Sequence, residues 1–251
     1  MKELSVVIVA YNEEDRIKRC LESIKWANEI IVVDGFSNDS TVDICKQYTE
    51  KIYQRKWDGF ISQKNYALSL ATKEWVLSLD ADEELSELLM DEIKGVLGNN
   101  DVDCDAYSMP RKTYYLGRWI LHSGWYPDRK VRLIKKGAGI WGAVEPHDAL
   151  IVKGRVCSLK HDILHWSFRN IAHHIQKLNY FTDSAALEVI KTNKRVNITD
   201  IIFHPIGMFI KMFLLKKGFL DGIQGFIAAA VSSFHVMMKY AKVWERTGGK
   251  K

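Results

Sequence analysis

Residues 4–35, LSVVIVAYNEEDRIKRCLESIKWANEIIVVDG, decide the fold. The run from Leu4 to Ala10 is apolar, unbroken and rich in β-branched residues, as expected of a parallel strand buried on both faces. Residues 12–15 supply a cap and first-turn acids for a helix that ends near Trp26, and a second buried strand follows at 29–35. This order predicts two parallel strands joined by a right-handed helical crossover.

The same alternation of strand and helix continues to residue 97. The elements expected there are a helix ending at Tyr48, a strand at 51–57, a helix at 59–71, a strand at 74–80 and a helix at 87–97. We therefore predict an α/β fold with a mostly parallel, doubly wound sheet flanked by helices. Short strands, aromatic residues and glycine-containing turns follow at 105–160, and the chain becomes helical again after residue 165.

The positive charge of the chain gathers at its C-terminal end. The 251 residues carry a formal net charge of +5, and from Thr199 onward 8 Lys and Arg stand against 3 Asp and Glu. The same region contains two apolar segments, 201–215 and 222–238, each shorter than the roughly 20 residues of a membrane-spanning helix. We expect helices that lie on an anionic membrane surface, and no nucleic acid as partner.

The four cysteines lie far apart, without the spacing of a metal or redox motif. They are Cys20, Cys45, Cys104 and Cys157. The start of the chain also lacks the pattern of a signal peptide. Both features predict reduced thiols in a cytoplasmic protein.

Polar residues follow three of the predicted strands, and ligands of open α/β sheets bind at that edge. Asp80 and Asp82, after the strand at 74–80, are spaced to approach one divalent cation, Mg²⁺ or Mn²⁺, which would also bridge a diphosphate. The alternative is that one of these acids only caps the next helix. Their position at a strand end favours the metal. Glycine-rich dinucleotide loops and Walker loops are absent from the sequence.

Residues 5–41 and 59–85 resemble the family 2 glycosyltransferases, which have the nucleotide-diphospho-sugar transferase (GT-A) fold, a Rossmann-like architecture. Residues 125–136 and 161–182 resemble the branch of that family that builds lipopolysaccharide cores, particularly the core glucosyltransferases. We expect a GT-A catalytic domain at 1–165, with a nucleotide-sugar half (1–100) and an acceptor half (101–165). A helical, membrane-associating extension is expected at 166–251.

The resemblance also implies roles for individual residues. The uridine of the donor would be surrounded by Ala10, Tyr11, Glu13 and Asp34. Lys64 matches a basic residue near the nucleotide, Asp80 matches the acid near the ribose or sugar, and Asp82 matches the acid nearest the metal. Many relatives read VDDGSTD where residues 33–39 read VDGFSND, so a second acid beside Asp34 is missing.

Members of this family invert the anomeric carbon and use a carboxylate to deprotonate the acceptor hydroxyl. Two carboxylates are candidates for this base, and both remain open. Glu145 follows an apolar run, as a strand-end residue does, whereas Asp148 follows His147 in a segment that resembles a Val-His-Glu sequence of relatives. His147 is itself a candidate contact, or a histidine with an ordinary structural role.

Five further residues are weaker candidates. Arg129 and Arg132 are suited to grip a diphosphate or an acceptor phosphate, or they line a solvated strand face. Trp125 is suited to stack on an acceptor sugar, although aromatic residues more often pack in cores. His161 and His165 are considered as a third metal ligand, but a half-buried structural role is favoured for both.

Together these features predict an inverting, metal-dependent transferase on the cytoplasmic face of the inner membrane. It would move glucose from UDP-glucose to a lipid-linked lipopolysaccharide core acceptor. The alternatives are a transferase of the same fold acting on another cell-envelope glycan, and a non-catalytic, membrane-bound scaffold that binds a nucleotide-sugar. A HAD-type phosphatase is disfavoured because its D-x-D follows the first strand, not the fourth.

Overall fold

The computed structural model describes residues 2–99, 103–143, 148–193 and 195–248. The chain forms two compact units, and each is described by itself. The first unit comprises Met1–Arg111 and Asp128–Trp166, and the second comprises Lys112–Pro127 and Ser167–Lys251. The expected boundary near residue 165 falls beside the last residue of the first unit. Residues 112–127 differ from the expectation, because they associate with the C-terminal helices.

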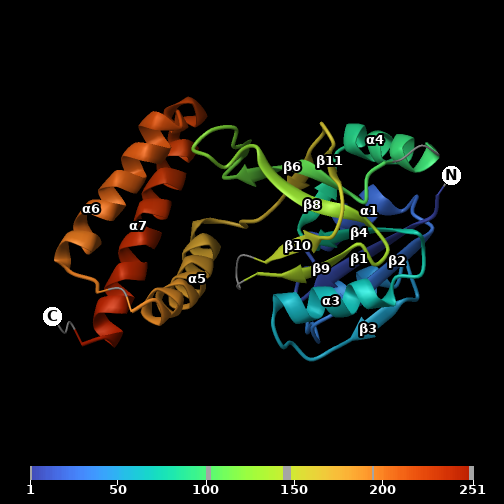
Figure 1. Ribbon diagram of the computed structural model, residues 1–251, viewed down its shortest axis with the longest axis horizontal. Helices are drawn as coiled ribbons and strands as arrows, with labels where there is room; N and C mark the ends of the chain where they lie inside the picture. Colours follow the sequence, from blue (N-terminus) through green and yellow to red (C-terminus); the bar gives the residue numbers. More distant parts are fainter. Residues whose placement is uncertain (1, 100–102, 144–147, 194, 249–251) are drawn as a thin grey trace. The chain divides into compact units, whose positions relative to one another are not determined.

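The first unit is built on one sheet with the strand order β3-β2-β1-β4-β8-β6-β12-β5. The strands are β1 (Leu4–Ala10), β2 (Glu29–Asp34), β3 (Ile52–Gln54), β4 (Trp75–Asp80), β5 (Glu83–Leu85), β6 (Ala106–Tyr115), β8 (Asp128–Lys135) and β12 (Ile163–His165), with β11 (Val156–Ser158) beside β6. The pairs β1–β2, β1–β4 and β2–β3 are parallel, as predicted, and β8 is antiparallel to β4. The carboxyl ends of β2, β1 and β4 therefore meet at one edge (Figure 1).

Helices cover both faces of this sheet. They are α1 (Ile17–Ile24), α2 (Thr41–Cys45), α3 (Phe60–Leu70) and α4 (Glu87–Gly98). One core joins α1 and α4 to alternate residues of β1, including Val6 and Ile8. A second core on the other face joins Ala67 of α3 to Val7 and to the hairpin of β9 (Gly139–Gly142) and β10 (Ala149–Val152). The alternation of strand side chains thus fills both layers.

Helix α1 begins at Ile17, later than predicted. Asn12 has a positive φ of 53°, and its side-chain oxygen accepts a hydrogen bond from the Asn38 backbone at 2.9 Å. The Glu14 carboxylate accepts from the Ser40 backbone at 2.9 Å. The polar residues after β1 therefore hold the loop after β2 and do not form the first turn of the helix.

The acids after β4 do not cap helix α4. Ser86 is the N-cap, and its hydroxyl accepts a hydrogen bond from the Leu89 backbone at 3.2 Å. Glu83 and Glu84, which follow the D-x-D, belong to β5, which pairs with β12. Glu83 is completely buried, and its carboxylate contacts Arg111 of β6 and Arg132 of β8.

The prediction of four reduced cysteines is wrong for two of them. Cys104 and Cys157 form a disulfide with a Cα–Cα distance of 6.0 Å. The pairing of β11 with β6 brings these two residues together, although 53 positions separate them in the sequence. Cys20 and Cys45 are free and buried, as expected of structural thiols.

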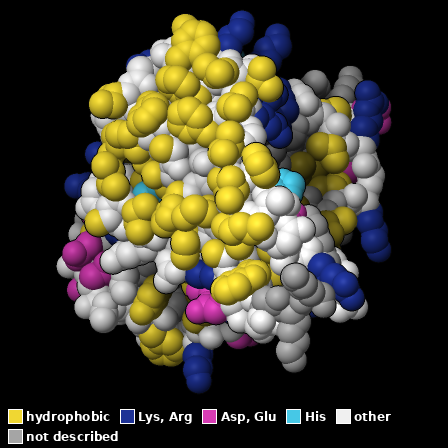
Figure 2. Space-filling model, turned by 90° about the vertical axis from the view of Figure 1, so that its left-hand side faces the viewer, with side chains coloured by type: hydrophobic (Ala, Val, Ile, Leu, Met, Phe, Trp, Pro, Cys, Tyr) yellow, Lys and Arg dark blue, Asp and Glu magenta, His cyan; other side chains and the backbone are white. Residues whose placement is uncertain are grey.

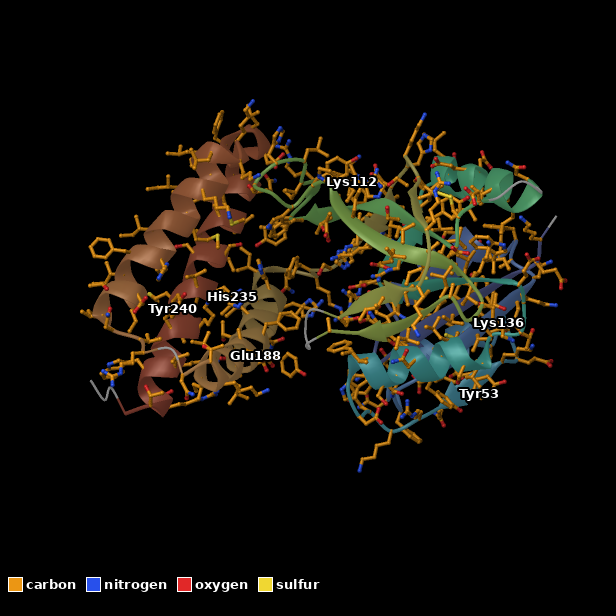
Figure 3. All side chains as sticks on the ribbon, in the orientation of Figure 1. Tyr53, Lys112, Lys136, Glu188, His235 and Tyr240 are labelled. Atoms are coloured by element: carbon orange, nitrogen blue, oxygen red, sulfur yellow. A yellow bond between two sulfur atoms is a disulfide. The ribbon has the colours of Figure 1, made fainter. Side chains whose placement is uncertain are left out.

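The second unit consists of three long helices and residues 112–127. Its elements are β7 (Arg118–Trp119), α5 (Ile171–Lys191), α6 (Ile198–Ile210), a π-helical turn (Lys211–Leu215), a 3₁₀ turn (Gly218–Asp221) and α7 (Gly222–Arg246). The ring of His204 on α6 stacks on that of Tyr240, which Figure 3 labels on α7, with centroids 4.9 Å apart. The buried Asp221 carboxylate accepts hydrogen bonds from the backbones of Leu121 and His122. Residues 112–127 are thereby tied to the start of α7.

An apolar surface extends over α6, the two turns and α7 (Figure 2). Its large exposed side chains include Ile198, Ile202, Phe203, Ile206, Ile210, Leu214, Leu215, Phe219, Leu220, Ile223 and Phe226. Residues 198–215 and 218–246 are long and apolar enough to cross a membrane by length and composition, which corrects the expectation that both are too short. We call these exposed residues the apolar helical face.

Candidate active site

A chain of buried charges lies at the end of β4, where the sequence predicted a ligand site. Lys64 on α3 places its Nζ 2.7 Å from Oδ1 of Asp80 and 2.8 Å from Oδ2 of Asp148. Arg132 on β8 contacts the other oxygen of Asp80 at 2.9 Å. Two elements that are separate in the sequence, α3 and β8, therefore converge on the first acid of the D-x-D, and Asp148 joins them through Lys64.

These contacts set the ionisation of Asp80. Burial by itself raises the pKa of this carboxyl, but the positive charges of Lys64 and Arg132 outweigh burial and hold its pKa well below the usual range. Arg132 also has a raised pKa in spite of its burial, because Glu83 and Asp80 surround it. Asp80 is therefore ionised at neutral pH, with both oxygens already engaged by cations.

Glu83 and Arg111 belong to the same network, although neither is among the site residues expected from the sequence. Arg132 contacts Glu83 at 2.8 Å, and Arg111 contacts Glu83 at 3.0 Å. Burial raises the pKa of the Glu83 carboxyl, and the two guanidinium groups lower it below its usual value. No local sequence pattern identifies these two residues. Arg111 and Arg132 come to face the buried acid only when β6 and β8 pair.

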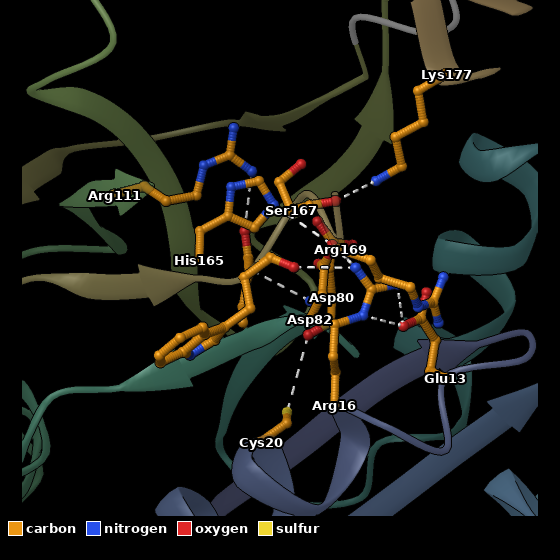
Figure 4. Close-up of polar contacts among 12 residues, drawn as sticks. Glu13, Arg16, Cys20, Asp80, Asp82, Arg111, His165, Ser167, Arg169 and Lys177 are labelled. Carbon is orange, nitrogen blue, oxygen red and sulfur yellow. Dashed lines mark hydrogen bonds and ion pairs between the residues drawn. The ribbon is translucent and has the colours of Figure 1, made fainter. Parts of the chain in front are cut away.

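The second acid of the D-x-D lies beside a histidine. Oδ2 of Asp82 is 3.5 Å from Nε2 of His165 and 3.7 Å from the Arg16 guanidinium (Figure 4). Arg16 is held in turn by the Glu13 carboxylate, whose Oε2 accepts from Nε at 2.6 Å. The sequence favours a structural role for His165, but the pairing of β12 with β5 brings this histidine beside Asp82, the candidate metal ligand.

Asp82 and His165 are suited to supply two ligands of a divalent cation. No three His, Cys, Asp or Glu side chains among the described residues form a metal-binding cluster. Divalent cations at nucleotide sites, however, often take one or two protein carboxylates and complete their shell with phosphate oxygens and water. A carboxylate oxygen beside an imidazole nitrogen is a donor pair of this partial kind.

One candidate base, Asp148, lies near the same charges. Asp148 is paired with Lys64, whose Nζ also sits 4.3 Å from the ring centroid of Trp141. Glu145 and His147 lie outside the described residues. Asp148 is therefore the one predicted base whose surroundings are known.

The residues expected around the uridine lie at the ends of β1 and β2. Ala10 is buried, and its carbonyl accepts a hydrogen bond from the Gly35 backbone at 2.8 Å. Tyr11 is exposed at the edge of the sheet. Asp34 is buried, and its carboxylate accepts from the hydroxyl and backbone of Ser37. These bonds give Asp34 a loop-forming role in addition to the base contact that the resemblance implies.

Two weaker candidates have structural roles. Arg129 donates to the carbonyls of Leu159 and Ser108. Trp125 packs in the second unit with its ring 5.3 Å from that of Tyr115. Of the two candidate arginines in the first unit, Arg132 alone contacts the acids at the end of β4.

Comparison of sequences gives a consistent set of relatives. The family model for glycosyl transferase family 2 matches residues 5–153. A glycosyltransferase of Rickettsia typhi is 30% identical over 256 residues, which cover 98% of this chain and 88% of that protein. The lipopolysaccharide core biosynthesis glycosyltransferase LpsC of Rhizobium meliloti is 26% identical over 250 residues, covering 97% and 92% of the two chains.

Two solved structures share the fold. TarS of S. aureus in complex with UDP-GlcNAc is 15% identical with a TM-score of 0.51, covering 94% of this chain and 81% of that one. The mannosyltransferase PcManGT of Pyrobaculum calidifontis, in complex with GDP-Man and Mn²⁺, is 14% identical with a TM-score of 0.56, covering 96% and 87%. The GT-A fold and the C-terminal helical extension predicted from the sequence are thereby confirmed.

Proposed function

The chain belongs to glycosyl transferase family 2, and we propose that it transfers glucose from UDP-glucose to a lipid-linked lipopolysaccharide core sugar, with inversion of the anomeric carbon. The observation that carries this proposal is the convergence of Lys64, Arg132 and His165 on the acids Asp80 and Asp82. The similarity to LpsC over 97% of the chain supports the acceptor class.

The basic residues of the site suit a diphosphate leaving group. Departure of a nucleoside diphosphate from a sugar develops negative charge on phosphate oxygens, and fixed cations stabilise that charge. Lys64 and Arg16 each contact an acid of the D-x-D and lie where a diphosphate would meet it. Asp82 and His165 would hold Mg²⁺ or Mn²⁺, which when bound supplies Lewis-acid neutralisation of the phosphate charge.

We assign Asp148 as the base that deprotonates the acceptor hydroxyl. Its ion pair with Lys64 holds the carboxylate close to Asp80 and therefore within the proposed donor site. A donor that engages Lys64 through its phosphates would weaken this pair and leave the carboxylate to accept a proton. Glu145 is the second candidate for this role.

The apolar helical face supports a lipid-borne acceptor at an anionic membrane surface. Leu215 and Ile223 are 73% and 69% exposed, and Lys211, Lys216 and Lys217 accompany the same turns. Apolar side chains that enter the headgroup region, with lysines beside them, are typical of interfacial helices. We propose that this face holds the enzyme on the cytoplasmic side of the inner membrane, where its acceptor lies.

Calorimetric titration of nucleotide-sugars tests the proposed transferase function. A panel of UDP- and GDP-sugars is titrated into the full chain with Mn²⁺ and with EDTA. We expect metal-dependent binding of UDP-glucose, lost in Asp82→Ala and kept in Asp43→Ala, which removes an exposed acid paired with Lys46. Radiolabelled transfer to lipid-linked core acceptor then checks the reaction.

A different donor or acceptor in these assays would move the assignment to another cell-envelope glycan. The absence of binding by any nucleotide-sugar to folded protein would contradict the transferase. Binding without turnover on any acceptor would favour the alternative, a membrane-bound scaffold.

A further inference from the structure

Two aromatic rings stand exposed at the edge of the sheet that carries the proposed site. Tyr11 follows β1 and is 53% exposed, and Phe36 follows β2 and is 55% exposed. The parallel register places Ala10 opposite Asp34, so both rings leave the sheet at the same edge. A Cβ added to Gly35 would lie 3.3 Å from Cβ and Cδ2 of Tyr11, so the Tyr11 ring lies against the peptide that precedes Phe36.

The backbone at Phe36 is in a conformation that suits glycine. Its φ is +65°, in the left-handed region where a Cβ is sterically costly and bulky side chains are rare. The surrounding loop imposes this conformation. Ser37 donates its backbone N–H to Asp34 at 3.0 Å, and the Ser37 hydroxyl accepts from the Asn12 backbone at 2.9 Å.

Neither folding nor packing accounts for a phenyl ring at this position. A glycine would adopt the same backbone without steric cost, and the ring is too exposed to contribute much to either core. Strained residues that persist in this way gather at ligand sites, where the side chain contributes to binding. We therefore interpret the Phe36 ring as part of a binding site for a ligand.

The position of the two rings indicates which part of the proposed nucleotide-sugar donor would lie beside them. Val9 on β1 pairs with Asp80 on β4, so the strand order at this edge is β2, β1, β4. Neighbouring strands are about 4.8 Å apart, which puts the Phe36 side of the edge about 10 Å from the acids. A nucleoside diphosphate with its phosphates at the charged residues would extend its planar, uncharged base toward the rings.

We propose that Phe36 is a further binding residue for the nucleotide-sugar, adding a second aromatic ring beside Tyr11, which the resemblance already implies at the uridine, so that the base stacks on both rings. This inference rests on the proposed function. Aromatic stacking recognises the face of a base and not its edge, so the two rings strengthen nucleotide binding more than they select among bases.

The test compares Phe36→Gly and Phe36→Trp in the full chain. Phe36→Gly removes the ring and relieves the backbone, whereas Phe36→Trp keeps an aromatic face and adds a fluorescent probe. UDP and pyrophosphate, each with Mn²⁺, are titrated calorimetrically into wild type and both variants. We expect Phe36→Gly to weaken UDP binding roughly 5- to 100-fold, about 1–3 kcal/mol. Pyrophosphate binding should change less than about twofold, because pyrophosphate has no base to stack.

The variants also separate binding from folding. The melting temperature of Phe36→Gly should equal or exceed that of wild type, because glycine removes the steric cost of a positive φ. Phe36→Trp should retain UDP affinity within about threefold, and the emission of the introduced indole should change when UDP binds.

Three outcomes would overturn the inference alone. They are unchanged UDP affinity in Phe36→Gly, equal losses of affinity for UDP and pyrophosphate in that variant, and an emission of Phe36→Trp that responds to UDP no differently from that of wild type. Failure of wild type to bind any nucleoside diphosphate would overturn the proposed function and the inference with it.

Discussion

Arg132 is the residue whose removal most directly tests the buried charge network. Its side chain is 4% exposed and contacts Asp80 at 2.9 Å and Glu83 at 2.8 Å. Arg132→Met keeps the length of the side chain but leaves the two carboxylates with fewer cations. Breaking a buried ion pair by removing one partner costs about 3–5 kcal/mol. Because Lys64 and Arg111 remain, we expect the lower end, about 3 kcal/mol.

This loss should be visible in both chemical and thermal unfolding. Urea titration followed by circular dichroism measures the free energy of unfolding, with the m-value as a check on the unfolded state. For a domain of this size, 1 kcal/mol lowers the melting temperature by about 2–4 °C, so we expect a decrease of about 6–12 °C. An exposed pair provides the control. Lys25→Met, which removes the partner of Glu22, should change stability by less than about 0.5 kcal/mol.

The effect of Arg132→Met should also depend on pH. The folded-state pKa values of Asp80 and Glu83 lie below the unfolded values of about 3.9 and 4.3. Their contribution to stability is therefore fully present above about pH 5 and is lost as the pH falls through the folded-state pKa values. Removing Arg132 reduces this lowering, so the difference between variant and wild type should be largest at about pH 7 and smaller at about pH 4.

A double variant identifies the cause of the loss. Glu83→Gln with Arg132→Met removes the charge that Arg132 would have compensated, so it should be at least about 1 kcal/mol more stable than Arg132→Met alone. The reasoning is refuted if Arg132→Met lies within about 1 kcal/mol of wild type, or if its deficit is the same at about pH 4 and pH 7.

Three further predictions concern the base, the apolar helical face and the disulfide. Asp148→Asn should lower kcat, measured by initial rates, by roughly 100- to 10,000-fold. Its affinity for UDP-glucose, measured by calorimetry, should stay within about threefold of wild type. A near-normal kcat would transfer the role of base to Glu145. Leu215→Glu combined with Ile223→Glu should reduce binding to anionic vesicles at least about tenfold in a flotation assay. The melting temperature should not fall, because both side chains are exposed. Unchanged flotation would exclude the apolar helical face as the membrane anchor. A reductant should destabilise wild type by about 2–4 kcal/mol but leave Cys104→Ser unaffected, since the bond closes a segment of 53 residues; equal responses in urea titrations would contradict a disulfide in solution.

Local sequence patterns were sufficient to predict most of the first unit. The apolar runs at β1, β2 and β4 predict buried strands, and helical crossovers between them predict that the strands are parallel. The same patterns placed Asp34 and Asp80 at strand ends, because a strand ends where its apolar run ends. These predictions succeeded because the information lies within a few neighbouring residues.

The partners of those acids depended on distant pairings. Lys64, Arg132 and His165 reach Asp80 and Asp82 from α3, β8 and β12, and no local pattern specifies which strands lie beside β4. The same reason explains why the role of Glu83 was missed, because its partners Arg111 and Arg132 come from β6 and β8.

The sequence by itself thus determined the class of fold, the edge of the sheet that carries the site, and the acids at that edge. Each follows from apolar periodicity and strand ends. The tertiary structure alone decided which cations neutralise the acids, which cysteines pair, and that residues 112–127 join the helices. These features depend on contacts between residues tens of positions apart, which form only when strands pair and helices pack.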